Sequence, residues 1–484
     1  MRVIGPILTL VLCGACTAGA AASGTTAGGN SSASNSGSTA TGTGGPTSSG
    51  TGTGGTSVGG TGSSATSSSG NTTASNATTG GPRPWPDTSS SIQVFSDQFD
   101  VSSATDAQLQ FAATHYAGAQ KLLASEVAKL RAYAPGFLLL HYRLGQALGD
   151  STPDAQCQPT TDYIQIIDGN SWVQEWPGDD AVQESWFFHV GESRVFNCTY
   201  GWYLAQLDDP TWLAYWPPLV VQQIQACDAD GLFADSFSIP NYFGATDYNP
   251  NLPVIDAGFE DGWATMEHDF TDAMRTTFAG RYLWIPNIGS YITSRDPSDY
   301  SNVDGAMIEG FAELGGGNYL APSDWELQQN RALALVSAGK ILLAQTYPSD
   351  TDVDERMFIL GTYLLVKGSR TYVNLDAEGL QIQWFPEYGI DLGAAADPLP
   401  ASIGALQDPS SQLFVRRYAN GLVLVNPSSA PETYALPDTV YQVVPSGGGL
   451  VPADGTAPGS LSTTPVTSVT LQPDTAAVLL DAPL

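Results

Sequence analysis

Short apolar runs alternate with longer amphipathic stretches between about residues 85 and 400. Apolar runs bounded by turn residues are typical of strands that are buried on both faces, as in a parallel sheet whose connections are helices. Eight such runs predict strands at residues 92–97, 111–116, 137–142, 231–235, 282–287, 305–309, 341–345 and 371–374. Helices are predicted at residues 121–133, 212–226, 263–278, 325–338 and 355–366. Eight units of this kind predict an α/β fold in which the strands close into a (β/α)8 TIM barrel.

The pattern changes after about residue 400, where short apolar strands follow one another without helical stretches. Strands are predicted at residues 413–418, 422–425 and 466–471, and Asn420-Gly421 is a tight hairpin signal between the first two. We therefore expect the barrel to occupy residues 85–400 and a small antiparallel, sandwich-like β domain to occupy residues 401–484.

The N-terminal region has no pattern of buried positions. Residues 1–21 resemble an export signal, with Arg2, an apolar run and then small residues. Gly14-Ala15-Cys16 is similar to a bacterial lipoprotein cleavage box and predicts lipidation of Cys16; ordinary cleavage, giving a soluble secreted protein, is the alternative. Residues 22–84 are rich in Gly, Ser and Thr and bury too little apolar area to fold, so we expect a disordered tether.

The charge and the cysteine content of the chain limit the classes of partner and cofactor that it can bind. The 48 acidic and 17 basic residues give a net charge of −31, which repels nucleic acid and anionic lipid, so contact with a membrane is expected only through the N-terminal lipid. No CxxC pair or histidine cluster indicates a metal site, and we expect no cofactor. A disulfide between Cys157 and Cys198 is expected because both lie in loop-like segments, whereas Cys227 is interpreted as a buried apolar residue.

One motif occurs twice. Residues 230–237 and 304–311 share the form Asp-Gly-x-x-x-acid-x-Phe, in which an apolar strand ends in a carboxylate, Asp235 or Glu309. A charge directly after a buried strand is favourable only where it faces solvent, as at the mouth of a barrel. Two carboxylates at one mouth provide the acid and the nucleophile or base that cleave a glycosidic bond. The leading residues, Asp230 and Asp304, are interpreted as structural residues at the opposite end.

The chain also resembles a known family. The two motifs, together with residues 202–212, 384–388 and 420–427, are similar to the hypothetical glycosyl-hydrolase-like family 15. The resemblance covers about residues 92–430 and implies an exported glycoside hydrolase with a C-terminal β domain, acting on a carbohydrate. By analogy with retaining barrels that carry carboxylates on strands four and six, Asp235 is expected to be the nucleophile and Glu309 the acid/base, although the sequence alone leaves this division of roles open.

Other polar residues at predicted strand ends are candidates for binding sugar hydroxyls, and an aromatic ring can stack on a sugar face. The candidates are Asp97, His141, Tyr142, Asn287, Gln345, Tyr347 and Trp384, with His115 and Asn374 as further members of the set. Two alternative hypotheses for the function are a glycan-binding surface protein without turnover and a structural component of the cell surface.

Overall fold

The structure is a computed structural model, which describes residues 82–149, 151, 153–160, 182–377 and 379–484 and the backbone of two short strands at 166–167 and 174–175. The expected export signal, Cys16 and nearly all of the expected tether therefore lie outside the described residues.

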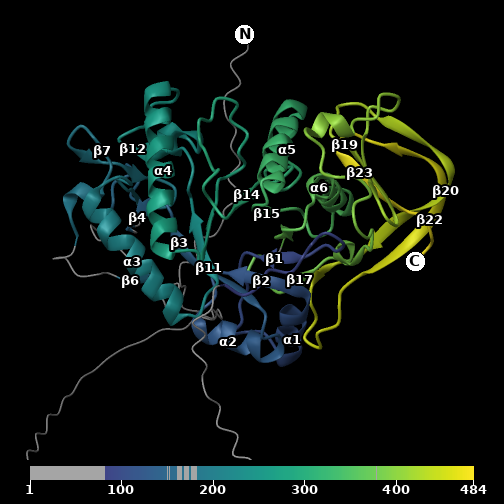
Figure 1. Cartoon of the computed structure of the whole chain (residues 1–484), viewed down its shortest axis with the longest axis horizontal. Coiled ribbons are helices and arrows are strands. Elements are labelled where there is room, and N and C mark those ends of the chain that lie inside the picture. Colours follow the sequence, from purple (N-terminus) through teal and green to yellow (C-terminus); the bar gives the residue numbers. More distant parts are fainter. Residues whose placement is uncertain are drawn as a thin grey trace, which may run out of the picture. The chain divides into compact units, whose positions relative to one another are not determined.

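Eight parallel strands form the centre of the molecule (Figure 1). In their order around the sheet they are β13 (Leu283–Pro286), β11 (Gly231–Asp235), β3 (Leu138–Leu144), β2 (Tyr116–Gln120), β1 (Val94–Ser96), β16 (Thr371–Leu375), β15 (Ile341–Thr346) and β14 (Gly305–Glu309). A parallel bridge between Asn287 and Met307 joins the two end strands. The sheet is thus closed, and the prediction of a TIM barrel is confirmed.

Helices surround the strands, although two connections depart from a regular (β/α)8 arrangement. The described helices are α1 (Asp106–His115), α2 (Ala124–Tyr133), α3 (Pro210–Ala226), α4 (Ala257–Phe278), α5 (Pro322–Ser337) and α6 (Val353–Val366). The link from β13 to β14, residues 287–304, contains no helix, and after β16 the chain continues toward the C-terminal sheet.

The second strand was misplaced by the apolar pattern. Residues 111–115 belong to α1, and the strand begins only at Tyr116. The helix starts at a capping box, in which the Thr105 side chain accepts a hydrogen bond from the Gln108 amide and the Gln108 side chain accepts one from the Thr105 amide. This cap fixes the start of the helix at Asp106, and the helix then continues through residues 111–115, which were predicted as a strand.

A long insert follows β3. Its strands β4 (Ala147–Leu148), β9 (Phe196–Asn197) and β10 (Tyr203–Leu204) form a four-stranded sheet with β12 (Tyr248–Asn249), which comes from the segment after β11. The predicted disulfide between Cys157 and Cys198 is present, and Cys227 is a buried free thiol, as expected. Trp186 and Trp202 are buried in the core of this region. The shortest pairs are β5 (Ile166–Ile167) with β6 (Gln174–Glu175), and β7 (His189–Val190) with β8 (Ser193–Arg194).

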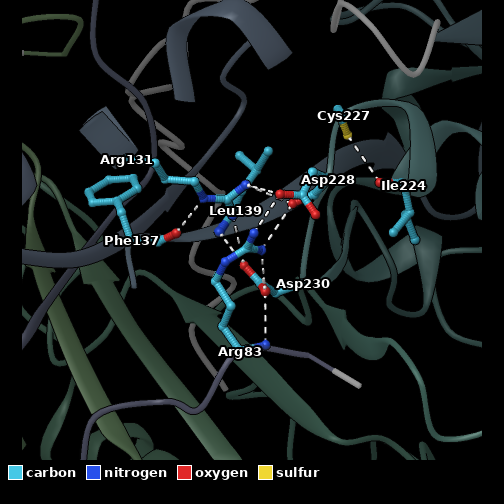
Figure 2. A network of polar contacts seen from close by, with 8 residues as sticks. All are labelled: Arg83, Arg131, Phe137, Leu139, Ile224, Cys227, Asp228 and Asp230. Atoms are coloured by element: carbon cyan, nitrogen blue, oxygen red, sulfur yellow. Dashed lines mark hydrogen bonds and ion pairs between the residues drawn. The ribbon is translucent and has the colours of Figure 1, made fainter. Parts of the chain in front are cut away.

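The base of the barrel, at the N-terminal ends of the strands, is closed by the segment that precedes β1. Trp85 stacks on Phe95 and makes an edge contact with Tyr372, two side chains of the cluster inside the barrel. Beside it, the guanidinium groups of Arg83 and Arg131 converge on Asp228 and Asp230 (Figure 2). The start of the described chain is therefore fixed to the barrel base by packing and by charge.

Asp230 and Asp304 are structural residues, in agreement with the interpretation from the motif. Asp230 accepts a hydrogen bond from the Leu139 amide of β3, and Asp304 accepts one from the Trp284 amide of β13. Each also pairs with arginine: Arg83 and Arg131 in the first case, Arg275 in the second.

The glycine of each motif allows close approach to the next strand. A Cβ at Gly231 would come within 2.5 Å of the Leu283 carbonyl oxygen, and one at Gly305 would come within 2.5 Å of the Ile341 Cβ. Both halves of the Asp-Gly pair therefore hold neighbouring strands in register at the barrel base.

Residues beyond 400 form a five-stranded antiparallel sheet in the order β18 (Phe414–Tyr418), β19 (Gly421–Asn426), β23 (Thr475–Leu480), β20 (Glu432–Ser446) and β22 (Ser460–Leu471). A separate pair joins β17 (Gln383–Trp384) to β21 (Gly449–Leu450). The larger sheet packs on α6 (Figure 1), where the Arg416 side chain donates hydrogen bonds to the carbonyls of Leu364, Leu365 and Lys367. These bonds satisfy carbonyl groups that the end of a helix leaves unpaired.

Replacing Asp230 should destabilise the fold far more than replacing Asp228. Asp230 is buried, so Asp230→Ala removes the acceptor of a buried amide and the partner of two arginines, and we expect a loss of about 3 kcal/mol in the free energy of unfolding. Asp228 is 66% exposed, and Asp228→Ala should cost less than about 1 kcal/mol. Chemical denaturation of both variants measures the two free energies of unfolding. Equal losses in the two variants would show that Asp230 is not the main residue that fixes the barrel base.

Candidate active site

The two predicted carboxylates end their strands in the same way. Asp235 is the last residue of β11 and Glu309 is the last residue of β14. The next residue in each case has a left-handed backbone, with φ of 52° at Ser236 and 77° at Gly310, which turns the chain away from the strand. Because side chains alternate along a strand, Asp235 lies on the same side as Phe233 and Glu309 on the same side as Met307, both of which point into the barrel.

Asn287 brings the two carboxylates together from the strand between them. Its side-chain nitrogen donates to Asp235 Oδ1 at 2.8 Å and to Glu309 Oε2 at 2.5 Å. The two oxygens therefore cannot lie further apart than the sum of these distances, 5.3 Å. The predicted pair is thus assembled at the barrel mouth, with an amide that contacts both members.

Each carboxylate is also held by a tyrosine. The Tyr142 hydroxyl donates to Asp235 Oδ2 at 3.0 Å, and the Tyr347 hydroxyl donates to Glu309 Oε1. Gln345 donates to the Tyr347 hydroxyl at 2.9 Å and accepts a bond from Asn374 at 3.2 Å. Four predicted sugar-binding candidates, Tyr142, Asn287, Gln345 and Tyr347, therefore lie in the carboxylate network and orient its acids.

The environments of the two acids differ. Burial, and next the charge of Asp235, raise the pKa of Glu309, while the bonds from Tyr347 and Asn287 act in the opposite direction. Asp235 accepts hydrogen bonds from Tyr142, Asn287 and the Ser236 amide, and such bonds stabilise an ionised carboxylate. Burial beside Asp235 thus favours the protonated form of Glu309.

The opposite side of the mouth carries a second charged cluster, of which the sequence indicated only Asp97. Asp97 follows β1 and pairs with Lys121, which follows β2, at 2.8 Å. Asp376 follows β16, and burial together with the charge of Asp97 raises its pKa to about 7. The Lys121 ammonium group lies 5.2 Å from the centre of the Tyr142 ring, which links this cluster to the carboxylate pair. Lys121 and Asp376 were missed because neither ends an apolar run in the motif that singled out the two acids.

Three candidates are not at the mouth. His141 faces outward, since its neighbour Tyr142 faces inward; its ring lies against Gln223 of α3 and Cys227. His115 ends α1 and stacks on Phe111, and the Trp384 ring contacts Phe111, His115, Tyr116 and Tyr388. These three side chains therefore do not take part in the carboxylate network, and a role for them in binding sugar stays a prediction.

Two general features of the described residues bear on function. They contain no group of three or more His, Cys, Asp or Glu side chains that could hold a metal ion. None of the helices in the described part of the chain is long and apolar enough to cross a membrane.

Comparison of the sequence with models of known families gives one match. The model of hypothetical glycosyl hydrolase family 15 matches residues 131–422, more than half of the chain. The chain belongs to this family. The matched stretch includes Asp235, Glu309, Asn287, Tyr142 and Tyr347, whereas Asp97 and Lys121 precede it. The family assignment makes a glycosyl hydrolase domain the setting of the carboxylate pair.

No curated protein sequence matches the chain. Among solved structures, a cycloisomaltooligosaccharide glucanotransferase from Paenibacillus sp., complexed with cycloisomaltoheptaose, is 8% identical with a TM-score of 0.32 and is matched over 81% of this chain and 55% of its own. A noncanonic maltogenic α-amylase, AmyB from Thermotoga neapolitana, is 9% identical with a TM-score of 0.39, over 80% of this chain and 98% of its own. The chain thus spans only about half of the glucanotransferase.

A second carboxyl pair, Glu313 and Glu355, connects the loop that follows β14 to α6. Both residues lie within the stretch 131–422 matched by the family model. Glu313 and Glu355 are buried, and both accept a hydrogen bond from the Gly317 amide, at 3.1 and 2.6 Å. Burial, and next the charge of Glu355, raise the pKa of Glu313 to about 9 from its ordinary 4.5. This pair, which no motif in the sequence indicated, joins the loop after Glu309 to the first turn of α6.

Glu313 should make the protein less stable as the pH rises. Its pKa is higher in the folded than in the unfolded chain, so the folded state binds the proton more tightly and stability is lost between about pH 4.5 and pH 9. Glu313→Gln should remove that part of the pH dependence. Between pH 5 and pH 8 its free energy of unfolding should therefore fall less than that of the wild type. Denaturation midpoints at both pH values measure it. Glu326→Gln, at an exposed position of α5, serves as the control, and an unchanged pH slope in Glu313→Gln would show that the pair does not share a proton.

Proposed function

We propose that this protein is an exported glycoside hydrolase that cleaves glycosidic bonds with retention of configuration. Asp235 attacks the anomeric carbon and Glu309 protonates the leaving oxygen. Glu309 then takes a proton from the water that releases the glycosyl group from Asp235, as the double-displacement mechanism requires.

The contact of Asn287 with both acids carries this proposal. Retaining enzymes hold their two carboxyl groups about 5–5.5 Å apart, and inverting enzymes about 6.5–9.5 Å apart, because a water molecule must fit between them. The two bonds of Asn287 hold Asp235 Oδ1 and Glu309 Oε2 within 5.3 Å of each other, and this proximity of the two oxygens favours the shorter spacing of the carboxyl groups.

The different surroundings of the acids support the division of roles. An acid catalyst must be protonated before the reaction, and burial beside Asp235 raises the pKa of Glu309 in that direction. A nucleophile must be ionised, and three hydrogen-bond donors surround Asp235. Asn287, which contacts both acids, is placed to hold them as the charge moves from one to the other.

We further propose that lipid on Cys16 retains the protein at the outer face of a bacterial membrane, with residues 22–84 as the tether. The Gly-Ala-Cys box and the apolar run before it support this location.

Removal of each acid should have a different kinetic signature. Asp235→Ala should lower kcat/KM by at least about 10⁴-fold on every substrate, because no glycosyl-enzyme can form. Glu309→Ala should lower it by about 10²- to 10⁴-fold on alkyl glycosides but far less on 2,4-dinitrophenyl glycosides, whose leaving group needs no proton. Steady-state kinetics on both substrate types measures this. Asp304→Asn, which keeps an acceptor for the Trp284 amide at the barrel base, is the control and should remain active.

Equal losses on both leaving groups in Glu309→Ala would contradict its role as the acid. Glycan binding without turnover of any glycoside by the wild type would instead support a glycan-binding surface protein.

The first-formed sugar should have the configuration of the substrate. Proton NMR during the first turnovers resolves the two anomers before they equilibrate. Appearance of the opposite anomer first would exclude Asp235 as nucleophile, because a single displacement by water inverts the centre.

Loss of Cys16 should release the protein from the membrane. Cys16→Ser should move from the detergent phase to the aqueous phase on phase partitioning, since a lipid chain is the proposed anchor. A Cys13→Ser variant is the matched control and should stay in the detergent phase. Unchanged partitioning of Cys16→Ser would exclude the lipid at this position.

A further inference from the structure

The barrel mouth is ringed by polar side chains from all eight strands, and the ring has two halves of different chemistry. Glu309, Asn287 and Asp235 come from three neighbouring strands, β14, β13 and β11. On the opposite arc, Lys121, Asp97 and Asp376 follow β2, β1 and β16, which are also neighbours. The remaining two strands, β3 and β15, contribute the residues that connect the halves: Tyr142 on one side, and Gln345 with nearby Tyr347 on the other.

The two arcs lie on opposite sides of the mouth. A sugar ring that lies across the mouth with its anomeric carbon at the Asp235–Glu309 pair directs its remote hydroxyl groups toward the opposite arc. A glycosyl group held in this way spans the two arcs of the same ring of strands.

Lys121 has the position and the chemistry to bind such hydroxyls. Its backbone is left-handed, with φ of 59°, directly after the last residue of β2. The ammonium group pairs with Asp97 and lies within 6 Å of the Tyr142 and Phe233 ring centres, the former ring belonging to the residue that binds Asp235. An ammonium group has three N–H donors, and can therefore bind a carboxylate and a sugar oxygen together.

Asp376 complements the lysine. Its Oδ1 accepts a bond from Gln383 at 2.9 Å, and a carboxyl whose pKa is about 7 exchanges between donor and acceptor forms near neutral pH. A sugar hydroxyl is itself both a donor and an acceptor, so either form of Asp376 can pair with it.

The charges of the ring select against acidic sugars. Asp97, Asp376, Asp235 and Glu309 are the acids, and Lys121, already paired with Asp97, is the one cation among the ring residues named here. A uronate or sulfated sugar at this position would meet a surplus of negative charge, and the whole chain carries −31.

Building on the proposed function, we propose that Lys121, with Asp97 and Asp376, is a specificity-determining cluster that binds the hydroxyls of a neutral glycosyl group at the edge remote from the cleaved bond. Lys121 donates to a hydroxyl oxygen, and Asp376 pairs with a neighbouring hydroxyl.

The test compares variants and substrates that lack the same contact. Full-length protein is assayed against 4-nitrophenyl glycosides of neutral hexoses, and the hexoside turned over fastest is then compared with its 3-, 4- and 6-deoxy analogues and with the corresponding uronide. The wild type should prefer the neutral hexoside over the uronide by at least about 100-fold and should turn over at least one deoxy analogue about 100-fold less well.

Lys121→Met should lower kcat/KM on the parent hexoside by about 100-fold but on that deoxy analogue by less than about 5-fold, because the contact is already absent. Asp376→Asn should show the same pattern with a different deoxy analogue. Lys121→Met leaves Asp97 without its ion pair; the Asp97→Asn/Lys121→Met double variant removes both charges and keeps the test valid if the single variant does not fold.

Three outcomes would overturn the inference. Equal losses by Lys121→Met on the parent and on every deoxy analogue would indicate a purely structural ion pair. Preference of the wild type for the uronide would show that Lys121 recognises a carboxylate. In both cases the proposed function stands, because turnover has been observed. Absence of turnover of the whole panel and of polysaccharides by the wild type would overturn the proposed function together with this inference.

Discussion

The alternation of side chains along each barrel strand, held in register at the base, decides which residues meet at the mouth. Asp230 and Asp304 bind the amides of the preceding strands, and the glycines that follow them let the next strands approach closely. Five residues further along, the same strands deliver Asp235 and Glu309 to the mouth. A shift of one residue in either strand would turn its acid outward and separate the pair. The repeated motif is therefore a unit in which one acid holds the strand and the other performs chemistry.

The closeness of the two acids at the mouth is a second constraint on the structure. Two carboxylates at close range repel one another unless one holds a proton or both are bound by donors. The shared nitrogen of Asn287 and the two tyrosine hydroxyls supply such donors, and they do so from strands on either side of each acid. The hydrogen bonds from Asn287 and the two tyrosines therefore reduce the repulsion between the two acids, and the proposed chemistry depends on this.

Much of the barrel and part of the site could be predicted from the sequence, because burial leaves a simple signal. Seven of the eight predicted barrel strands share at least half of their residues with the observed strands, and the eighth shares only Tyr116. Runs such as Leu138-Leu139-Leu140 have few other places in a globular fold. The same run concealed which face each residue takes, so His141 was expected at the mouth when its neighbour Tyr142 lies there. The helix over residues 106–115 was missed because its capping box was outweighed by the apolar residues that follow. Lys121, Asp376 and the Glu313–Glu355 pair depend on contacts between distant segments, for which a single sequence holds no pattern.

The closure of the barrel base has a mechanical consequence. The chain enters the described structure at Arg83 and Trp85, which are bound to Asp230, Phe95 and Tyr372 at the N-terminal ends of the strands. Tension exerted through the preceding chain therefore loads the end of the barrel furthest from Asp235 and Glu309. The load passes first to the ion pairs of Arg83 and to the partly buried indole ring of Trp85, and only then to the strands. A molecule loaded in this way can be pulled by its leading segment while the opposite rim, with its ring of polar side chains, keeps its geometry.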